Sequence, residues 1–281
     1  MKRESNMAQP FEVITPDDKP IWLCLRQEAS DALIAEPGLA SMLHSTILSH
    51  DDLASALSYH IARKMGDDSI RGMTLREIVQ RTYESDRALI EAAEADLQAV
   101  YERDPAAKGY LQAFMFFKGF LSLQVHRVAH RLWRDGRTTM AHFLQSRVSE
   151  LFQIDINPAA RIGKGVFLDH GTGIVIGETA VVGDDCSILQ GVTLGGTGAE
   201  RGDRHPKIGK GVLLGAGANV LGNITIGDYA KIASGSVVLK PVPAHCTAAG
   251  VPARLVNCKT CEDPARTMDH TMPDIDLDYS I

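Results

Sequence analysis

The sequence predicts an α+β fold in which a helical domain over residues 1–153 precedes a parallel β-helix over 154–255 and a flexible tail over 256–281. Three observations lead to this prediction. Apolar residues between positions 156 and 242 return at every sixth position, those before them have helical spacing, and the last stretch is acidic and repeat-free. A chain of 281 residues can bury a core in one large or two medium domains.

The six-residue repeat is carried by three runs of apolar anchors. They are Ile156, Ile162, Leu168; Ile176, Val182, Ile188, Leu194; and Ile208, Leu214, Val220, Ile226, Ile232, Val238. This period fits neither one helix nor one strand, but it fits short strands joined by tight turns, with three hexapeptides in each triangular coil. Glycine often follows an anchor directly, as at Gly163 and Gly209, and we expect these glycines at corners with positive φ.

Helical signals fill the first domain after a lead of about 18 residues that we expect to be frayed. The predicted helices are one capped by Asp51-Asp52 and closed by Gly66, one opened by a capping box at 74–77, one over 86–103, the strongest from Asp104-Pro105 to about Gly136, and one over 138–152. The aromatic residues of the last two helices are interpreted as packing between helices or subunits rather than as a cofactor site.

Composition excludes several classes of protein. The net charge is −6 and no long basic run suggests a nucleic-acid interface. No apolar stretch approaches the roughly 20 residues that span a bilayer, and residues 1–11 lack the apolar core of a signal peptide. The chain is therefore predicted to be cytoplasmic.

The five cysteines are an odd and scattered set. Cys186 takes an inward position of the repeat, so we expect a buried, reduced thiol. Cys258 and Cys261 form a CxxC pair, but the sequence offers neither a second pair to complete a zinc site nor a βαβ unit for a redox centre. We assign no role to this pair.

The repeat is interrupted twice, and each interruption contains a histidine. The frame slips by two residues between Leu168 and Ile176, around His170, and fourteen residues separate Leu194 from Ile208, around His205. Polar, glycine-rich departures from a regular solenoid are where function is usually placed.

Charged residues near these histidines indicate acid–base chemistry. His170 lies fifteen residues after Asp155, and a coil of about eighteen residues would place it nearly above that carboxylate, which could then orient a general base. The alternative is a solvent-facing turn histidine. Arg204, beside His205, could hold a carboxylate through two hydrogen bonds. Asp104 in isolation is interpreted as a helix cap.

The chain resembles the serine O-acetyltransferase family over nearly its whole length. The segments that carry the resemblance are 155–160 (Asp-Ile-Asn-Pro-Ala-Ala), 168–180 (Leu-Asp-His-Gly-Thr-Gly-Ile-Val-Ile-Gly-Glu-Thr-Ala), 195–198 (Gly-Gly-Thr-Gly), 202–209 (Gly-Asp-Arg-His-Pro-Lys-Ile-Gly) and 248–254 (Ala-Ala-Gly-Val-Pro-Ala-Arg). The resemblance implies that the β-helix is left-handed. It also implies acetyl transfer from acetyl-CoA to L-serine, the first step of cysteine biosynthesis from serine, without a metal.

The resemblance also implies site residues. His170 would be the base and Asp155 its partner. Serine would be bound through its amino group by Asp104 and Asp169, and through its carboxylate by Arg204 and His205. Acetyl-CoA would lie between neighbouring coils of a trimer, near Gly196, Gly215, Ala216, Ser234 and Arg254.

Regulation and assembly are implied in the same way. The family is inhibited by L-cysteine in the serine site, and it forms trimers that pair through their helices into homohexamers. Its terminal isoleucine enters O-acetylserine sulfhydrylase, the next enzyme, and Ile281 stands at that position here.

Three alternatives remain open at this point. The first is another hexapeptide acyltransferase with a different acceptor. The second is a zinc hydrolyase on the same solenoid, for which His170, His205 and His245 are the candidate ligands, although their spacing shows no rung-to-rung pattern. The third is a non-catalytic scaffold for the sulfhydrylase.

Overall fold

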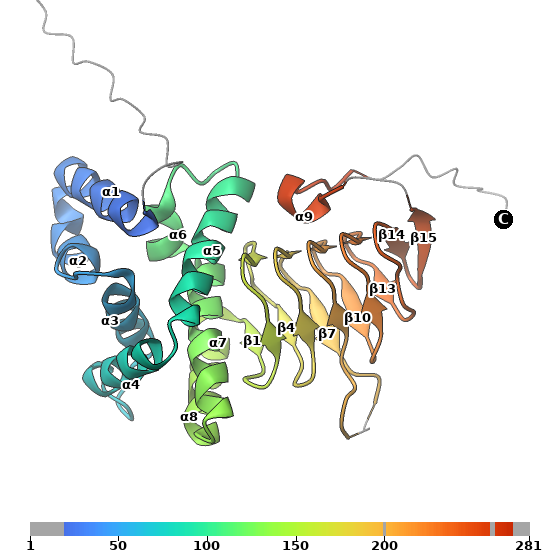
Figure 1. The fold of residues 1–281 in the computed structure, drawn as a ribbon, viewed down its shortest axis with the longest axis horizontal. Helices are drawn as coiled ribbons and strands as arrows, with labels where there is room; N and C mark the ends of the chain where they lie inside the picture. The colour runs from blue at the N-terminus through green and yellow to red at the C-terminus, as the bar shows by residue number, and fades with distance from the viewer. Residues whose placement is uncertain (1–19, 199–200, 259–261, 272–281) are drawn as a thin grey trace, which may run out of the picture.

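The computed structural model describes residues 20–198, 201–258 and 262–271. It confirms the predicted order, a helical region followed by a left-handed parallel β-helix (Figure 1). The predicted lead, Cys261 and Ile281 lie outside the described residues. No helix in the described part of the chain is long and apolar enough to cross a membrane.

The helical region consists of long helices and short helical turns. In chain order these are α1 (Ile21–Ala35), η2 (Pro37–Leu39), α2 (Ala40–Leu43), η3 (His44–Leu48), α3 (Leu53–Met65), α4 (Gly72–Ser85), α5 (Ala88–Arg103), α6 (Tyr110–Phe116), α7 (Lys118–Arg134) and α8 (Thr138–Phe152). Two predicted boundaries are confirmed at α3, where Asp52 accepts the N–H of Ser55 at 2.7 Å and Gly66 follows the last residue.

Two predicted helix starts are wrong. Asp104 does not cap a helix, because its carboxylate accepts the N–H of Ala106 at 2.8 Å in a turn after α5. The next helix begins at Tyr110 instead, and Glu28 of α1 accepts the N–H groups at its start. The predicted capping box at 74–77 lies inside α4, which begins two residues earlier. At the start of α6, the Glu28 side chain of α1 thus takes the place of the predicted local cap.

The β-helix has three parallel sheets, here called A, B and C. Sheet A contains β1 (Asp155–Ile156), β4 (Val175–Ile176), β7 (Thr193–Gly195), β10 (Asn219–Leu221) and β13 (Val237–Val238). Sheet B contains β2 (Arg161–Ile162), β5 (Val181–Val182), β8 (Lys207–Ile208) and β11 (Thr225–Ile226). Sheet C contains β3 (Phe167–Leu168), β6 (Ser187–Ile188), β9 (Leu213–Leu214), β12 (Lys231–Ile232), β14 (Thr247–Gly250) and the antiparallel β15 (Ala253–Asn257).

The chain visits the sheets in the order A, B, C, so three edges run along the β-helix. We call them the A–B, B–C and C–A edges after the sheets that each turn connects. The anchors pair in register, and Ile156 lies beside Ile176, which comes 20 residues later. The next coil has 18 residues, from Ile176 to Leu194, and the next has 26, from Leu194 to Val220. Both predicted interruptions therefore lengthen a coil.

The glycines after the anchors have a different role from the predicted one. Positive φ occurs three residues after an anchor, as at Gly191 (71°) and Gly217 (68°), whereas Gly163 and Gly209 are not in that region. A Cβ on Gly163 or Gly209 would instead collide with the Asp184 or Asp228 carboxylate of the next coil. These positions require glycine because successive coils approach closely there.

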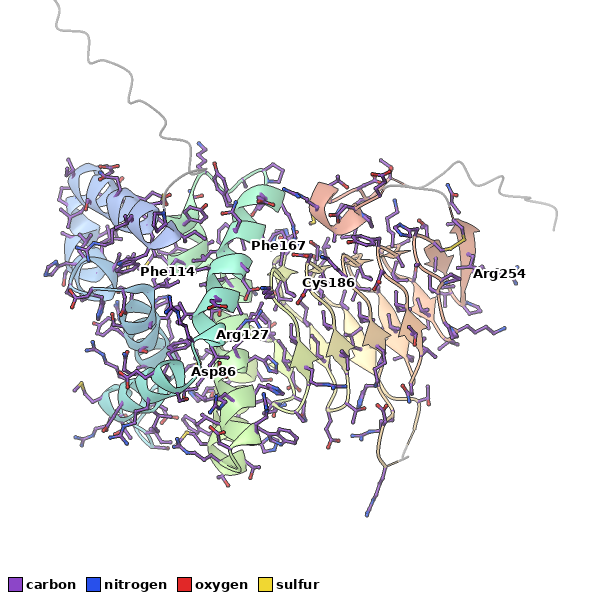
Figure 2. All side chains as sticks on the ribbon, viewed as in Figure 1. Asp86, Phe114, Arg127, Phe167, Cys186 and Arg254 are labelled. Carbon is purple, nitrogen blue, oxygen red and sulfur yellow. A yellow bond between two sulfur atoms is a disulfide. The ribbon has the colours of Figure 1, made fainter. Side chains whose placement is uncertain are left out.

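A buried ion pair joins the helices to the β-helix. Arg127 of α7, labelled in Figure 2, donates two hydrogen bonds of 2.9 Å to Asp96 of α5 and others to the carbonyls of Ile162 and Gly163. Asp96 also accepts the N–H of Val166 at 3.0 Å. Burial raises the pKa of Asp96, and Arg127 opposes that shift. The pair fixes how the helical region meets the first coil.

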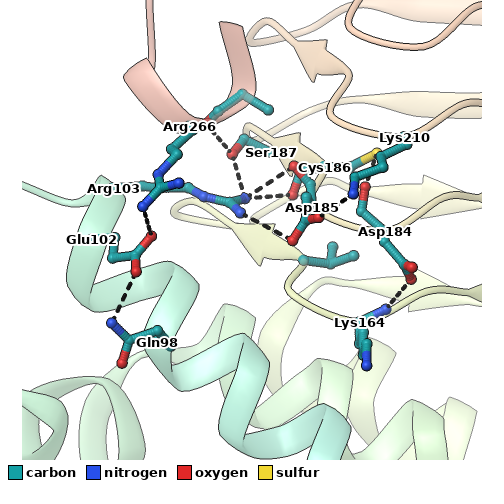
Figure 3. A network of polar contacts seen from close by, with 12 residues as sticks. Gln98, Glu102, Arg103, Lys164, Asp184, Asp185, Cys186, Ser187, Lys210 and Arg266 are labelled. Carbon is teal, nitrogen blue, oxygen red and sulfur yellow. Dashed lines mark hydrogen bonds and ion pairs between the residues drawn. The ribbon is translucent and has the colours of Figure 1, made fainter. Parts of the chain in front are cut away.

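The stretch predicted as a flexible tail contains two described elements. β15 reaches Asn257, and α9 (Pro264–Thr267) covers the outer face of sheet C. Figure 3 shows how α9 is held: Ser187 donates to the carbonyl of Ala265 at 2.8 Å and also accepts a hydrogen bond from Arg103 of α5.

The cysteines divide into free and paired thiols. Cys186 is buried and free, as predicted, and burial raises the pKa of its thiol to about 12. Cys246 and Cys258 form a disulfide that joins the ends of the β14–β15 hairpin. The sequence assigned no partner to either residue, because they come together only when the chain reverses after β14.

Candidate functional site

His170 lies on the C–A edge, in the two extra residues of the first coil. Its φ of 56° is in the left-handed region, which is uncommon for a residue with a side chain. The side chain is 74% exposed, and its Nε2 lies 3.8 Å from the Asp169 carboxylate. An imidazole held at a strained corner and open to solvent is available to a substrate.

The start of helix α7 packs against the turn that contains His170. A Cβ on Gly119 would collide with the carbonyl oxygen of Leu168, so only glycine allows the helix to approach so closely. The Lys118 ammonium donates to the Thr172 hydroxyl two residues beyond His170. The turn around His170 is therefore held in place by the start of α7.

Asp104 is close enough for its charge to act on the carboxyl of Asp169, the neighbour of His170. Burial raises the pKa of Asp169, the nearby Asp104 raises it further, and His170 opposes the shift. Asp104 comes from the turn after α5, so the helical region supplies one carboxylate and the C–A edge supplies the other. Two carboxylates that disfavour each other's charge are suited to bind a cation such as an ammonium group.

The prediction that Asp155 lies nearly below His170 assumes a coil of about eighteen residues. The first coil has 20 residues, so Asp155 is paired with Val175. Its carboxylate accepts a hydrogen bond of 2.7 Å from Gln145 of α8. Within the described residues, no hydrogen bond or ion pair joins Asp155 to His170.

Arg204 and His205 lie on the A–B edge, in the long loop between β7 and β8. The Arg204 guanidinium forms an ion pair of 2.8 Å with Glu178 of the coil before. His205 is 7% exposed, and its Nδ1 lies 2.9 Å from the Thr179 hydroxyl and 3.2 Å from the Thr179 N–H. Burial lowers the pKa of His205, and the Arg204 charge lowers it further.

A cavity of about 480 Å³ is lined by Glu178 and Thr179, which contact Arg204 and His205. It is bounded by the C-terminal half of α7 and by the A–B edge. The lining residues include His130, Trp133, Arg134, Arg161, Glu178 and Thr179. The cavity is open space, next to the residues that hold Arg204 and His205, for a small polar molecule.

The predicted acetyl-CoA residues are distributed over both edges. Gly215, Ala216 and Ser234 lie on successive turns of the C–A edge, and a Cβ on Gly215 would lie 2.6 Å from the Ser234 nitrogen. Gly196 lies on the A–B edge, 3.5 Å from Arg204 when a Cβ is added. Arg254, labelled in Figure 2, lies on β15 and is exposed.

The site is thus divided within one chain. The C–A edge brings together Asp104, Asp169 and His170, and the A–B edge brings together Gly196, Arg204 and His205, with sheet A between them. His245 lies on the remaining B–C edge, so the three candidate zinc ligands are on three different edges. Among the described residues, no group of three His, Cys, Asp or Glu side chains could hold a metal ion.

Three residues that contact the site were not singled out from the sequence. They are Gln145, Glu178 and Thr179. The adjacent Glu178 and Thr179 were visible as a polar pair in the repeat, 26 residues before Arg204 and His205, which equals the length of the longest coil. Only knowledge of that coil length could have aligned the two pairs.

Comparisons with known proteins find family models and relatives that are similar to this chain. The family model "Serine acetyltransferase, N-terminal" matches residues 21–125, and the model "Bacterial transferase hexapeptide (six repeats)" matches residues 205–240. The serine acetyltransferase of Escherichia coli strain K12 is 52% identical over 249 residues, which cover 89% of this chain and 91% of that protein.

Two solved structures are similar over most of their length. A serine acetyltransferase in complex with cysteine has a TM-score of 0.89 and 49% identity, covering 90% of this chain and 98% of that one. The serine acetyltransferase of Brucella abortus strain S19 in complex with coenzyme A has a TM-score of 0.85 and 49% identity, covering 87% and 98% of the two chains.

Proposed function

The chain belongs to the serine acetyltransferase family, and we propose that its two half-sites act together across the contact between two copies. It transfers acetyl from acetyl-CoA to the hydroxyl of serine, the first step of cysteine biosynthesis from serine. The observation behind our proposal is the separation of His170 from Arg204 and His205 onto two edges of one β-helix. Placing the C–A edge of one copy against the A–B edge of another completes the set.

His170 is the proposed general base. The hydroxyl of serine is a weak nucleophile, so the imidazole takes its proton as the oxygen attacks the thioester carbonyl carbon. The carbon–sulfur bond then breaks, and the imidazolium returns the proton to the departing thiolate of coenzyme A. The exposure of His170 at a fixed corner supports this role. Backbone N–H groups at 195–196 are the proposed donors to the oxyanion.

Asp104 and Asp169 are the proposed partners of the serine ammonium group. Their mutual repulsion is relieved when a cation lies between them, so binding recovers electrostatic energy that the empty site lacks. Arg204 and His205 of the neighbouring copy are the proposed partners of the serine carboxylate. The two ends of the amino acid thereby orient its hydroxyl toward His170.

Asp155 remains the proposed partner of His170, although no hydrogen bond or ion pair joins the two within the described residues of the single chain. This role requires the exposed His170 side chain to turn toward sheet A when the site is assembled. The bond from Gln145 would keep Asp155 in place during that turn. Acetyl-CoA is proposed to lie along the C–A edge over Gly215, Ala216 and Ser234, and to reach Arg254 and the partner's Gly196.

We propose that L-cysteine inhibits the enzyme from the serine site. One solved relative is a complex with cysteine, and cysteine offers the same ammonium and carboxylate groups as serine. Asp104→Ala should therefore weaken both ligands together, which binding assays for serine and cysteine can compare. Cysteine inhibition that is unchanged in the variant would refute a shared site.

We also propose a trimer that pairs into a homohexamer in the cytoplasm, and a complex with O-acetylserine sulfhydrylase through Ile281. Deleting the last ten residues should abolish co-elution with the sulfhydrylase and leave serine turnover in place. Retained co-elution would remove the terminal residue from the interface.

The central experiment measures release of coenzyme A thiol from acetyl-CoA with L-serine. His170→Ala should reduce kcat by about 10²–10⁴-fold, the range typical of a lost general base. The matched control is His44→Ala, at an exposed histidine of the helical region, which should keep turnover. Turnover that survives in His170→Ala would move the base elsewhere. Turnover only with another acceptor in the unaltered protein would overturn the function.

A further inference from the structure

We propose that Thr179 is a positioning residue that aligns Arg204 with His205 and makes His205 a hydrogen-bond donor. The inference rests on the proposed function, in which these two residues bind the serine carboxylate. It extends that function by explaining what fixes their geometry and why only one of the two site histidines acts as a base.

Thr179 contacts both residues of the loop at once. Its hydroxyl oxygen accepts the backbone N–H of Arg204 at 3.0 Å and that of His205 at 3.1 Å. Its neighbour Glu178 holds the Arg204 guanidinium at 2.8 Å. Glu178 and Thr179 of one coil therefore hold Arg204 and His205 of the next coil.

The hydrogen bonds of Thr179 determine the tautomer of His205. A backbone N–H can only donate, so the His205 Nδ1 that faces the Thr179 N–H at 3.2 Å must be an acceptor. The Thr179 hydroxyl, whose oxygen already accepts two N–H groups, lies 2.9 Å from the same Nδ1. The neutral ring therefore carries its proton on Nε2.

This tautomer decides what His205 can do. Within the described residues, Nε2 has no hydrogen-bond partner, so its N–H is available to a carboxylate oxygen. A ring nitrogen that already bears the proton cannot remove one from serine, whereas the His170 imidazole has no such constraint. The two histidines are thus assigned different tasks by their surroundings.

Protonation of His205 would place an N–H on Nδ1 against the Thr179 N–H. The lowered pKa agrees with this, and burial is its first cause. The charged groups that face the ring are Arg204 and Lys207, which lower its pKa, and Glu178 and Asp203, which raise it. Removing the hydroxyl should raise the pKa of His205 toward its ordinary value.

The test compares Thr179→Val, which removes the hydroxyl but keeps the shape and the N–H, with Thr179→Ser, which keeps the hydroxyl. We expect Thr179→Val to raise the KM for L-serine about tenfold or more, since two or three hydrogen bonds are lost. The KM for acetyl-CoA should stay within about twofold, because Gly215, Ala216 and Ser234, over which acetyl-CoA is proposed to lie, are on the C–A edge. Thr179→Ser should restore the KM for serine.

Nitrogen NMR of histidine-labelled protein reads the tautomer without turnover. The His205 signal, assigned by its loss in His205→Asn, should show a bare Nδ1 and a protonated Nε2 in the unaltered protein, and the ring should become protonated at a higher pH in Thr179→Val. Thr225→Val, on an exposed strand position of sheet B, is the matched control and should change neither reading.

Three results would overturn the proposal: a proton on Nδ1 in the unaltered protein, an unchanged KM for serine in Thr179→Val, or failure of Thr179→Ser to restore it. A purely structural role would raise the KM for acetyl-CoA and the KM for serine alike.

Arg204→Ala separates this proposal from the proposed function. If Arg204→Ala raises the KM for serine and Thr179→Val does not, only Thr179 loses its role; if Arg204→Ala has no effect, the carboxylate site itself is misplaced.

Discussion

Mixing two inactive variants should restore activity if the site lies between copies. His170→Ala disables the C–A edge and Arg204→Ala disables the A–B edge, and these edges are separated by sheet A in each chain. In randomly mixed oligomers, about one site in four joins the intact edge of one variant to the intact edge of the other. Activity should therefore return to about a quarter of the unaltered level, measured as coenzyme A thiol release.

A matched pair of variants on one edge provides the control. His170→Ala mixed with Asp169→Ala should stay inactive, because both residues lie on the same C–A edge and no copy supplies an intact one. The two chains should be co-expressed with different tags and purified through both, so that every oligomer is mixed. Failure of the cross-edge pair to recover, or equal recovery by the same-edge pair, would refute a site shared between chains.

Three other predictions follow from the contacts. Gly177→Ala should raise the KM for serine, since the added Cβ would collide with the His205 ring, and an unchanged KM would show that the ring can move at no cost. Asp169→Asn should stabilise the protein at neutral pH: the folded pKa of Asp169 is raised, so its ionised form destabilises the fold once pH exceeds the unfolded pKa. Thermal unfolding should show this gain disappearing in acid, and a gain that persists there would contradict the cause. Arg127→Met should cost about 3–5 kcal/mol in denaturant unfolding by leaving Asp96 buried and unpaired, whereas the double replacement with Asp96→Leu should recover much of it.

Much of the fold could be predicted because the repeat is local. An apolar residue at every sixth position requires only that each side of a coil bury one anchor, so the anchors from Ile156 to Val238 identify the three-sided coil without knowledge of distant contacts. The interruptions around His170 and His205 were visible for the same reason, as departures from a fixed period.

The site was predicted in part. The resemblance to a family, and not a spacing rule, brought Asp104 into the set with Asp169 and His170, and the charge of Asp104 acts on the Asp169 carboxyl in the structure. The spacing argument for Asp155 assumed the wrong coil length, because two extra residues in the first coil shift the register and place Val175 beside it. A period can locate an insertion, but the number of residues per coil is decided by where the strands pair.

The sequence by itself determined the coil, the inward anchors and the two irregular turns, since these depend on neighbours within one period. Tertiary structure alone decided that Glu28 caps α6, that Gly163 and Gly209 are needed for close approach of coils, and that Thr179 sets the proton on His205. Each of these involves groups 19 or more residues apart, brought together by the packing of helices and coils. Sequence patterns over a few residues carry no information about such distant partners, so only the folded structure identifies them.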